Sequence, residues 1–389
     1  MTDRPHLTTV AVLGGGQLGT MLAEAAQPLR VRVQCLDPDP VAPASYNAQS
    51  FAEGDLRDPR TVEAFGRHAD VVTIEIEAVS TEGMRRLRDD HGRPVYPSPE
   101  ALATIQDKGL QKEHYRRHGI PTAPYRLYGD AVAARRAAED GVHAYPFVQK
   151  SRTGGYDGKG VKIVRSAADL DDLLPGPCLL EAFAPYTAEL AVIVARRPSG
   201  QARTYPVVEM AFDPEENLVT QLISPARIPA AVAEAARALA ERVAATLEVA
   251  GLLAVELFLN ADGTLWVNEV APRPHNSGHV TMDGFASSQF EQHLRAVLDW
   301  PLASTEQYRP AVMVNLLGDA SGAGEARYEG LDEVLALPGV HVHLYGKRLT
   351  KPYRKMGHVN VVAETIEEAI ATAGEVRARL RVVPAEDQP

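Results

Sequence analysis

Residues 254–279 read AVELFLNADGTLWVNEVAPRPHNSGH, and this stretch decides the fold and the chemistry that we expect. Two apolar runs flank Asp262-Gly263, a dipeptide that strongly favours a two-residue hairpin turn. Counting outward from that turn places Glu256 directly across from Glu269. Because like charges opposite each other destabilise a sheet face, the pair predicts a cation held between two carboxylates. Such ligands are typical of a Mg²⁺ site that phosphates complete, whereas the alternative is two exposed glutamates on a solvated edge.

Length and composition indicate a globular protein of two or three domains. The chain has 389 residues, of which 45% are hydrophobic and 23% charged. No apolar run is long enough to span a membrane, and the first residues, MTDRPHLTT, lack a signal-peptide pattern. Cys35 and Cys178 form neither a disulfide framework nor a metal-ligand spacing. We therefore expect a cytoplasmic protein.

The net charge of −11 disfavours nucleic acid or an anionic membrane as the partner. Small anionic substrates remain possible because the chain contains a local basic cluster. Its members are Lys347, Arg348, Lys351, Arg354 and Lys355.

The first hundred residues alternate between strand and helix patterns. Strands are expected at 10–13, 31–36 and 71–76, with helices at 17–26 and 59–68. This alternation is typical of an open parallel sheet in an α/β, Rossmann-like domain.

After residue 100 the pattern becomes α+β. A helix carrying Lys108, an alanine-rich helix at about 229–249 and a helix near 287–298 are expected. The expected strands are 146–150, 161–164, 178–181, 189–196, 204–210, 311–317, 340–344 and 358–363.

Gly14, Gly16 and Gly19 match a dinucleotide fingerprint, and Asp37 ends the next strand where a ribose-binding acid would lie. Read alone, this pattern favours an NAD(P)-dependent oxidoreductase. The pattern is weak, however, because the same glycines only require a tight turn at a helix N-terminus.

The loop SRTGGYDGKG, residues 151–160, is a better phosphate-binding candidate. It contains four glycines and Lys159, and Lys150 ends the strand that enters it. Glycine backbone can close N–H groups over phosphates while lysine supplies charge, although a long polar hairpin is the alternative. Together with the paired glutamates, the loop predicts an ATP–Mg²⁺ site that is not a Walker loop.

Several motifs in order resemble those of ATP-grasp carboxylate–amine ligases over nearly the whole chain. HNSGH and RKMGH make it resemble, among these, the 5-(carboxyamino)imidazole ribonucleotide synthetase family of purine biosynthesis. The motifs are GGGQLG at 14–19, QDK at 106–108, KSRTGGYDGKG at 150–160, NEVAPRPHNSGH at 268–279 and YGKRLTKPYRKMGHV at 345–359.

The resemblance implies an architecture and a reaction. A Rossmann-like preATP-grasp domain (1–104) would precede an ATP-grasp domain (105–299) with a mobile lid at about 120–180, and a small C-terminal αβ domain (300–389) would complete the substrate phosphate site. The reaction would be ATP-dependent carboxylation of 5-aminoimidazole ribonucleotide by bicarbonate, through carboxyphosphate. A homodimer is also implied.

The resemblance further implies an ATP site with Mg²⁺ or Mn²⁺ held by Glu256 and Glu269. In a regular strand Asn268 would point away from Glu269, so its participation requires a bulge. The implied ATP-binding residues are Lys108, Lys150, Gly155, Tyr156, Asp157, Gly158, Lys159, Gly160, Val161, Glu181, Ala182, Phe183, Ala184, Glu189, Asn268 and Glu269.

The implied substrate site combines three parts of the chain. Gln17, Leu18, Glu77 and Asn276 would contact the ribonucleotide's ring and ribose, and Lys347, Arg354 and Lys355 its phosphate. Arg273 and His275 would hold bicarbonate. The implied catalytic residues are Asp157, Arg273, His275, Lys347 and Arg354.

Some of these residues have plainer interpretations. Asp157 could accept a proton from the attacking amine or only stabilise a turn, and His275 could only cap a helix. Lys347 and Arg354 could be solvated surface charges.

Other functions remain open. TIEIEAV at 73–79 resembles the formate-dependent glycinamide ribonucleotide formyltransferases, which activate formate instead of bicarbonate. A non-catalytic nucleotide-sensing module is a further alternative.

Overall fold

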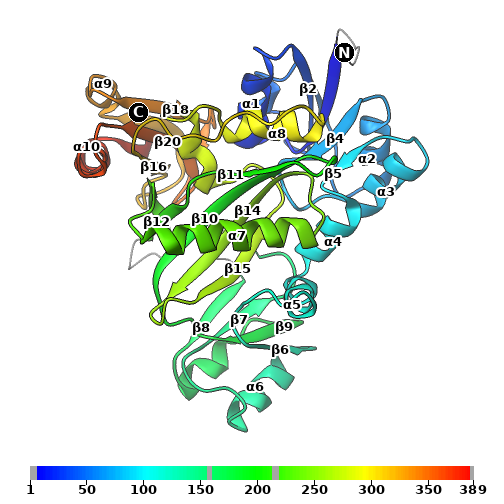
Figure 1. The fold of residues 1–389 in the computed structure, drawn as a ribbon, viewed down its shortest axis with the longest axis vertical. Coiled ribbons are helices and arrows are strands. Elements are labelled where there is room, and N and C mark those ends of the chain that lie inside the picture. Colours follow the sequence, from blue (N-terminus) through cyan, green and yellow to red (C-terminus); the bar gives the residue numbers. More distant parts are fainter. Residues whose placement is uncertain (1–6, 156–159, 213–218, 386–389) are drawn as a thin grey trace.

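The computed structural model describes residues 7–155, 160–212 and 219–385. An N-terminal sheet, a long central sheet and a small lid sheet follow one another down the molecule, and the C-terminal elements lie beside the first sheet (Figure 1). No helix in the described ranges is long and apolar enough to cross a membrane.

The N-terminal sheet is parallel, as the strand–helix alternation predicts, in the order β3-β2-β1-β4-β5. Its strands are buried on both faces: Val10 and Val12 pack into one core cluster, Ala11 and Leu13 into the other. The elements are β1 (Thr8–Leu13), α1 (Gln17–Ala26), β2 (Val31–Asp37), η1 (Pro43–Ser45), β3 (Ser50–Glu53), α2 (Pro59–Gly66), β4 (Val71–Ile74), α3 (Thr81–Asp89), β5 (Val95–Tyr96) and α4 (Pro99–Gln106).

The central sheet is antiparallel and has nine strands, in the order β15-β14-β10-β12-β13-β16-β20-β18, with β11 paired to β10. Helix α7 covers one face, where Leu239 and Val243 pack against Val192 and Val255. The elements before residue 300 are β10 (Tyr186–Arg196), β11 (Ala202–Thr204), β12 (Val208–Phe212), β13 (Val219–Ser224), α7 (Ala230–Thr246), β14 (Gly251–Asn260), β15 (Leu265–Ala271), η3 (Asn276–Met282) and α8 (Gln289–Val297).

The same sheet continues past residue 300 without interruption. β13 pairs with β16, from Ser224 opposite Ala311 to Gln221 opposite Val314, and β16 pairs with β20. A three-stranded sheet, β19-β17-β21, adds to the C-terminal part. The elements are β16 (Ala311–Leu317), β17 (Gly324–Glu329), α9 (Leu331–Leu335), β18 (Val340–Leu344), β19 (Leu349–Thr350), β20 (Lys355–Val362), α10 (Ile366–Arg379) and β21 (Arg381–Pro384).

The lid is a four-stranded antiparallel sheet in the order β6-β9-β7-β8. It lies at the far end of the central sheet from the N-terminal sheet (Figure 1). Its elements are β6 (Tyr125–Tyr128), α6 (Ala131–Glu139), β7 (Phe147–Ser151), β8 (Val161–Val164), η2 (Ala167–Asp172) and β9 (Cys178–Ala182).

Helix α8 joins the N-terminal and central sheets. Phe290 and Leu294 pack into the same core cluster as Val10 and Val12, and His293 Nε2 lies 2.8 Å from Thr73 Oγ1 of β4. The N-terminal sheet is therefore packed against the central sheet through shared apolar and polar contacts.

Candidate active site

The hairpin that joins β14 to β15 differs from the expected turn. The N–H of Asn260 donates to the carbonyl of Thr264 (2.9 Å), which encloses a three-residue loop with Gly263 at φ +82°. The prediction of a two-residue turn was therefore wrong. A three-residue loop with glycine in the left-handed region is the next most common hairpin connection.

A β-bulge restores the register that the longer loop displaces. The pairing shifts between Val255 and Leu257, so that Glu256 alone on β14 faces both Asn268 and Glu269 on β15. The prediction that Glu256 and Glu269 lie opposite each other is thus confirmed. The bulge is also the feature that a role for Asn268 requires.

The two carboxylates differ in surroundings. The Glu256 side chain is 16% exposed, and burial followed by the nearby Glu269 charge raises its pKa. The Glu269 side chain is 43% exposed and contacts the Lys108 ammonium, which lowers its pKa. No group of three or more Asp, Glu, His or Cys side chains suited to a metal occurs in the described ranges, so this pair would need ligand oxygens to complete a cation's shell.

Lys108 is fixed at the start of a helix. The predicted helix carrying Lys108 is α5 (Lys108–Arg117), which begins directly after Asp107, and a separate helix, α4, ends before Asp107. Asp107 caps α5 by accepting the N–H groups of Gly109 (2.8 Å) and Leu110 (3.2 Å). Its other oxygen lies 2.6 Å from Arg152 Nη2, which ties α5 to the end of β7.

Lys150 lies in a buried ion cluster. Its Nζ is 2.6 Å from Glu181 Oε1 and donates to Asn268 Oδ1 (2.8 Å). The other Glu181 oxygen lies 2.7 Å from Lys112 Nζ. Burial would raise the pKa of Glu181, but the two ammonium groups outweigh it and lower this pKa to about 2. Sequence reasoning missed Lys112, since a lysine on a charged helix normally indicates a solvated face.

The expected adenine hinge, residues 181–184, spans the end of β9. Phe183 is exposed and Ala184 buried, while Ala182 bonds through its N–H to the backbone of Pro124 (2.8 Å). Further along, burial raises the pKa of Glu189 to about 7, which a hydrogen bond from Tyr186 only partly offsets. The Glu181 carboxylate is engaged by two lysines, so the backbone of this segment and the exposed Phe183 side chain are the groups available to a base.

The glycine loop is described only at its two ends. The N–H of Ser151 donates to the carbonyl of Gly160 (2.8 Å), and Gly160 has φ +77°. Gly155 and Gly160 flank the gap, and Val161 begins β8. Four predicted residues lie outside the described ranges: Tyr156, Asp157, Gly158 and Lys159.

The first glycine turn binds the chain's own carboxylates. The buried Glu75 accepts the N–H groups of Gly16 (2.8 Å) and Gly19 (3.0 Å), and Asp37 accepts that of Gly15 (2.8 Å). Glu75 therefore occupies the helix N-terminus where a pyrophosphate would bind. This arrangement contradicts the dinucleotide interpretation, and sequence reasoning did not single out Glu75.

The residues expected at the ribonucleotide's ring lie near this turn and on the segment after β15. Gln17 is half-buried, whereas the Leu18 side chain packs into the core. Glu77 and Arg273 form an ion pair with each other (2.9 Å). Asn276 Oδ1 is buried and has no hydrogen-bond partner in the described ranges.

His275 both caps a helix and faces a carboxylate. Its Nδ1 lies 2.9 Å from Ser277 Oγ at the start of η3, and its Nε2 lies 3.6 Å from Glu256 Oε1. Gln289 fixes its backbone through two hydrogen bonds, of 2.9 and 2.8 Å. The capping interpretation is confirmed, and it leaves Nε2 directed at the carboxylate pair.

The expected phosphate-binding cations lie on the loop that leads into β20. Lys347 Nζ donates to the carbonyl of Lys355 (2.7 Å), and Arg354 to that of Leu349 (2.6 Å). The charge of Lys355 acts to lower the pKa of Glu256, so this loop lies within electrostatic range of the carboxylate pair.

The histidines of HNSGH and RKMGH meet in the interior. His279 and His358 are fully buried with their rings stacked at 4.7 Å, and burial lowers the pKa of both. Asn360 donates to the carbonyl of His279 (3.0 Å). The two motifs thus hold η3 against β20.

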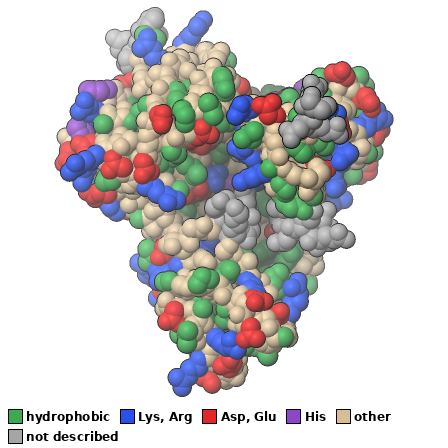
Figure 2. Space-filling model, turned by 180° about the vertical axis from the view of Figure 1, so that it is seen from behind, with side chains coloured by type: hydrophobic (Ala, Val, Ile, Leu, Met, Phe, Trp, Pro, Cys, Tyr) green, Lys and Arg blue, Asp and Glu red, His purple; other side chains and the backbone are tan. Residues whose placement is uncertain are grey.

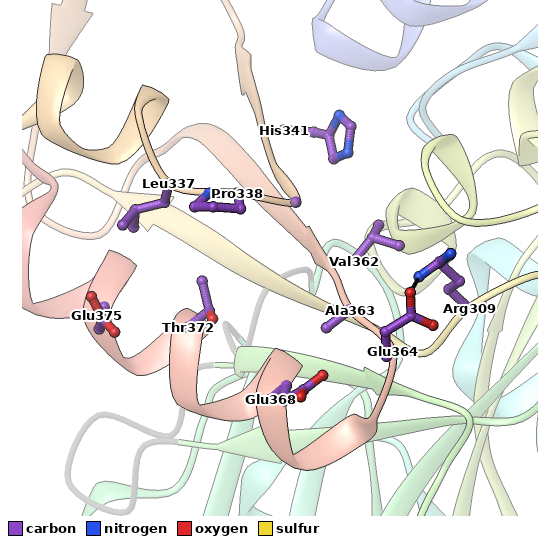
Figure 3. A pocket seen from close by; sticks show the side chains of 11 residues that line it. Arg309, Leu337, Pro338, His341, Val362, Ala363, Glu364, Glu368, Thr372 and Glu375 are labelled. Atoms are coloured by element: carbon purple, nitrogen blue, oxygen red, sulfur yellow. Dashed lines mark hydrogen bonds and ion pairs between the residues drawn. The ribbon is translucent and has the colours of Figure 1, made fainter.

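Seen from behind, the molecule is hollowed where its N-terminal, C-terminal and central parts meet, with Lys and Arg side chains around the hollow (Figure 2). A surface cavity of about 630 Å³ lies elsewhere, on the C-terminal part (Figure 3). Glu364, Glu368 and Glu375 line that cavity, and Arg309 is paired with Glu364. Its acidic lining makes it unsuitable for phosphates.

The fold and this site define an ATP-grasp protein. The family model for the ATP-grasp domain matches residues 113–290, and that for the ribonucleotide synthetase preATP-grasp domain matches residues 7–106. The model for the phosphoribosylaminoimidazole carboxylase C-terminal domain matches residues 311–372.

Individual relatives narrow the family. The N5-carboxyaminoimidazole ribonucleotide synthase of Synechococcus elongatus is 40% identical, over 90% of this chain and 89% of its own. The crystal structure of the synthetase from Thermotoga maritima has a TM-score of 0.89 at 39% identity, covering 97% of this chain and 100% of that one. The chain belongs to the N5-carboxyaminoimidazole ribonucleotide synthase family.

Two further comparisons bear on ligands and length. The Aspergillus clavatus synthase, solved in complex with ADP and 5-aminoimidazole ribonucleotide, has a TM-score of 0.86 at 34% identity, covering 95% of this chain and 98% of that one. The chain spans 64% of the length of the phosphoribosylaminoimidazole carboxylase of Saccharomyces cerevisiae, to which it is 37% identical over 92% of its own length.

Proposed function

We propose that this protein carboxylates 5-aminoimidazole ribonucleotide with bicarbonate and ATP, giving 5-(carboxyamino)imidazole ribonucleotide, ADP and phosphate in purine biosynthesis. The observation that carries the proposal is the bulged hairpin. It sets Glu256 against Asn268 and Glu269, beside Lys108 and Lys150. The family membership and the ligands of the Aspergillus clavatus relative support the same reaction.

The site fits ATP with a divalent cation. Glu256 has a raised pKa because it is buried near a second carboxylate, and a divalent cation between the two would relieve that repulsion. Mg²⁺ prefers such carboxylates together with phosphate oxygens, and it would neutralise charge on the transferred phosphoryl group. Lys108 and Lys150 would bind the phosphates, residues 181–184 the adenine and Glu189 the ribose.

The acceptor would lie between the first glycine turn and the basic loop. Gln17, Leu18 through its backbone, Glu77 and Asn276 would contact its ring and ribose. The unpaired Asn276 Oδ1 supports this role, because a buried acceptor without a partner is costly unless a ligand satisfies it. The phosphate would be held by Lys347, Arg354 and Lys355.

Bicarbonate would bind beside the carboxylate pair, at Arg273 and His275. Bicarbonate is a poor electrophile until it is phosphorylated, and carboxyphosphate hydrolyses in water, so closure of the lid over the site would protect it. The distance of 3.6 Å between His275 and Glu256 supports a position at the same centre. Asp157 in the lid loop remains a candidate proton acceptor.

The division into 1–104, 105–299 and 300–389 remains part of this proposal, together with a homodimer in the cytoplasm. The family membership supports these expectations only by analogy.

A phosphate-release assay with a panel of acceptors tests the activity. We expect ATP hydrolysis to be stimulated by 5-aminoimidazole ribonucleotide plus bicarbonate. Stimulation by glycinamide ribonucleotide plus formate instead would favour the formyltransferase reaction that TIEIEAV suggests. ATP binding without stimulation by either pair would favour a nucleotide-sensing module.

A further inference from the structure

Three charged side chains from three elements meet in the interior beside the phosphate site. Lys112 of α5 and Glu181 of β9 each keep 3% of their side-chain surface exposed, and Lys150 of β7 keeps 8%. The carboxylate lies between the two ammonium groups, at 2.7 Å and 2.6 Å. With both lysines protonated, this cluster has a net charge of +1.

The function proposed above uses Lys150 but gives Lys112 no role. With Lys150 alone as its partner, Glu181 would form a neutral buried pair, and little positive field would remain for a phosphate. We propose that Lys112 is a positioning residue for nucleotide binding: it balances the charge of Glu181, so that Lys150 keeps a net positive charge for the phosphates.

The contacts of Lys112 fix it in that position. Its Nζ donates to Thr122 Oγ1 (2.6 Å), and this hydroxyl donates to the carbonyl of Val267 (2.7 Å). Val267 immediately precedes Asn268, which accepts a hydrogen bond from Lys150 (2.8 Å). Lys112 is therefore linked to the bulge both through the ion cluster and through the strand's own backbone.

The inference rests on the proposed function only in requiring that the site binds a nucleotide. The test is the affinity of the full-length protein for Mg²⁺-ADP, measured by calorimetry, with melting temperature recorded for each variant. Loss of acceptor-dependent turnover would overturn the proposed reaction while leaving this binding test intact. The variants are Lys112→Met, the double variant Lys112→Met/Glu181→Gln, and Lys162→Met.

The double variant distinguishes charge balance from mere packing. Lys112→Met leaves a neutral Lys150–Glu181 pair, and we expect Mg²⁺-ADP to bind roughly 10- to 100-fold more weakly. Removing the Glu181 charge as well returns the cluster to +1, so binding should recover by about tenfold or more. Unchanged affinity in Lys112→Met, or no recovery in the double variant, would overturn the proposal.

Lys162→Met is the matched control. This lysine lies on β8 of the same lid sheet and donates to the carbonyl of Asp172 (2.8 Å), away from the ion cluster. Its removal should leave the affinity for Mg²⁺-ADP unchanged. An equal loss in this variant would mean that any lid lysine has the effect, which also contradicts the proposal.

A pH series gives a second test. It compares the wild type with the double variant, so it does not depend on whether Lys112→Met folds. Burial, opposed by Glu181 and assisted by Lys150 and Lys108, lowers the pKa of Lys112 to about 8, and the Tyr125 ring lies 6.0 Å from its Nζ. As the pH rises through that value, Lys112 loses its proton and the cluster loses its positive charge. Affinity for Mg²⁺-ADP should therefore fall between about pH 7 and pH 9.5 in the wild type but not in the double variant. Parallel curves would contradict the proposal.

Discussion

Two glycine-rich regions of this molecule differ in what their described residues contact. In the first turn, Glu75 and Asp37 occupy the backbone N–H groups of Gly15, Gly16 and Gly19. In the loop after β7, Gly154 has φ +77°, and no atom of the described residues lies within 4 Å of the position that its Cβ would take. Glycine residues in a sequence thus indicate the conformation of a turn. Whether the turn can bind a ligand depends on which groups already accept its backbone N–H groups.

Matched glutamate substitutions give the largest expected contrast. They compare Glu75, which fills the first glycine turn, with Glu269 of the carboxylate pair. Glu269→Gln should reduce turnover roughly 10²- to 10³-fold, because it removes a charge that acts on the phosphoryl group, with little change in melting temperature. Glu75→Gln should lower the free energy of unfolding by about 1–3 kcal/mol, because an amide can accept only one of the two N–H groups. The affinity of the Glu75→Gln variant for Mg²⁺-ADP should be unchanged. Steady-state kinetics, thermal melts and calorimetry measure these effects, and the reverse pattern would contradict both assignments.

A pair of alanine substitutions, at Gly14 and Gly154, compares the same two glycine-rich regions by their free energies of unfolding. A Cβ at Gly14 would lie 2.3 Å from Glu75 Cγ at a φ of +115°, so Gly14→Ala should cost roughly 3 kcal/mol or more. Gly154→Ala meets no atom within 4 Å among the residues that the structure describes, so it should cost only the left-handed strain, about 1 kcal/mol. Chemical denaturation of both variants measures the two free energies. Equal losses would mean that Glu75 can move aside.

The pH dependence of activation by Mg²⁺ tests the pair formed by Glu256 and Glu269. Burial and the nearby Glu269 charge raise the pKa of Glu256 above that of an ordinary glutamate. As the pH falls through this raised pKa, the carboxylate gains a proton and then competes poorly for a cation. Below the pKa, the Mg²⁺ concentration for half-maximal activity should rise up to about tenfold per pH unit. In Glu256→Gln the requirement should be high and independent of pH. A flat profile in the wild type would argue against this pair as the metal site.

The smallest effect is expected at the edge of the site. Arg354 is half-buried and donates to the carbonyl of Leu349 (2.6 Å), so Arg354→Ala removes one of several cations of the proposed phosphate pocket. We expect the KM for the ribonucleotide to rise about 3- to 10-fold and the KM for ATP to stay nearly constant. Initial-rate kinetics with each substrate varied separates the two. Equal changes would mean that the phosphate pocket is not separate from the nucleotide site.

The sequence predicted those helices and strands whose local residue pattern is regular. The helix at 17–26 and the strands at 161–164, 311–317 and 340–344 agree with the observed bounds. β13 and α10 were not predicted: β13 is a short strand whose buried and half-buried residues do not alternate, and α10 buries only a narrow stripe of small and apolar residues. The pairing of β13 with β16 was also beyond prediction, because it joins residues far apart in the chain.

Within the site, residue types were predictable but their partners were not. The opposed Glu256 and Glu269 followed from counting along two strands. The bulge that brings in Asn268 depends on strand geometry that no residue pattern announces. Lys112 and Glu75 were missed because their importance comes from burial, and a charged side chain in a sequence normally indicates solvent.

The uninterrupted pairing across residue 300 has a consequence for how this protein can be made and divided. A chain that stopped before β16 would expose the N–H and C=O groups of β13 as an unprotected edge, which invites aggregation. During synthesis, the strands up to β13 can pair first, but the edge at β13 is covered only after β16 has been made. The last ninety residues are in this sense a folding requirement, and they could not be exchanged freely between relatives as an independent module.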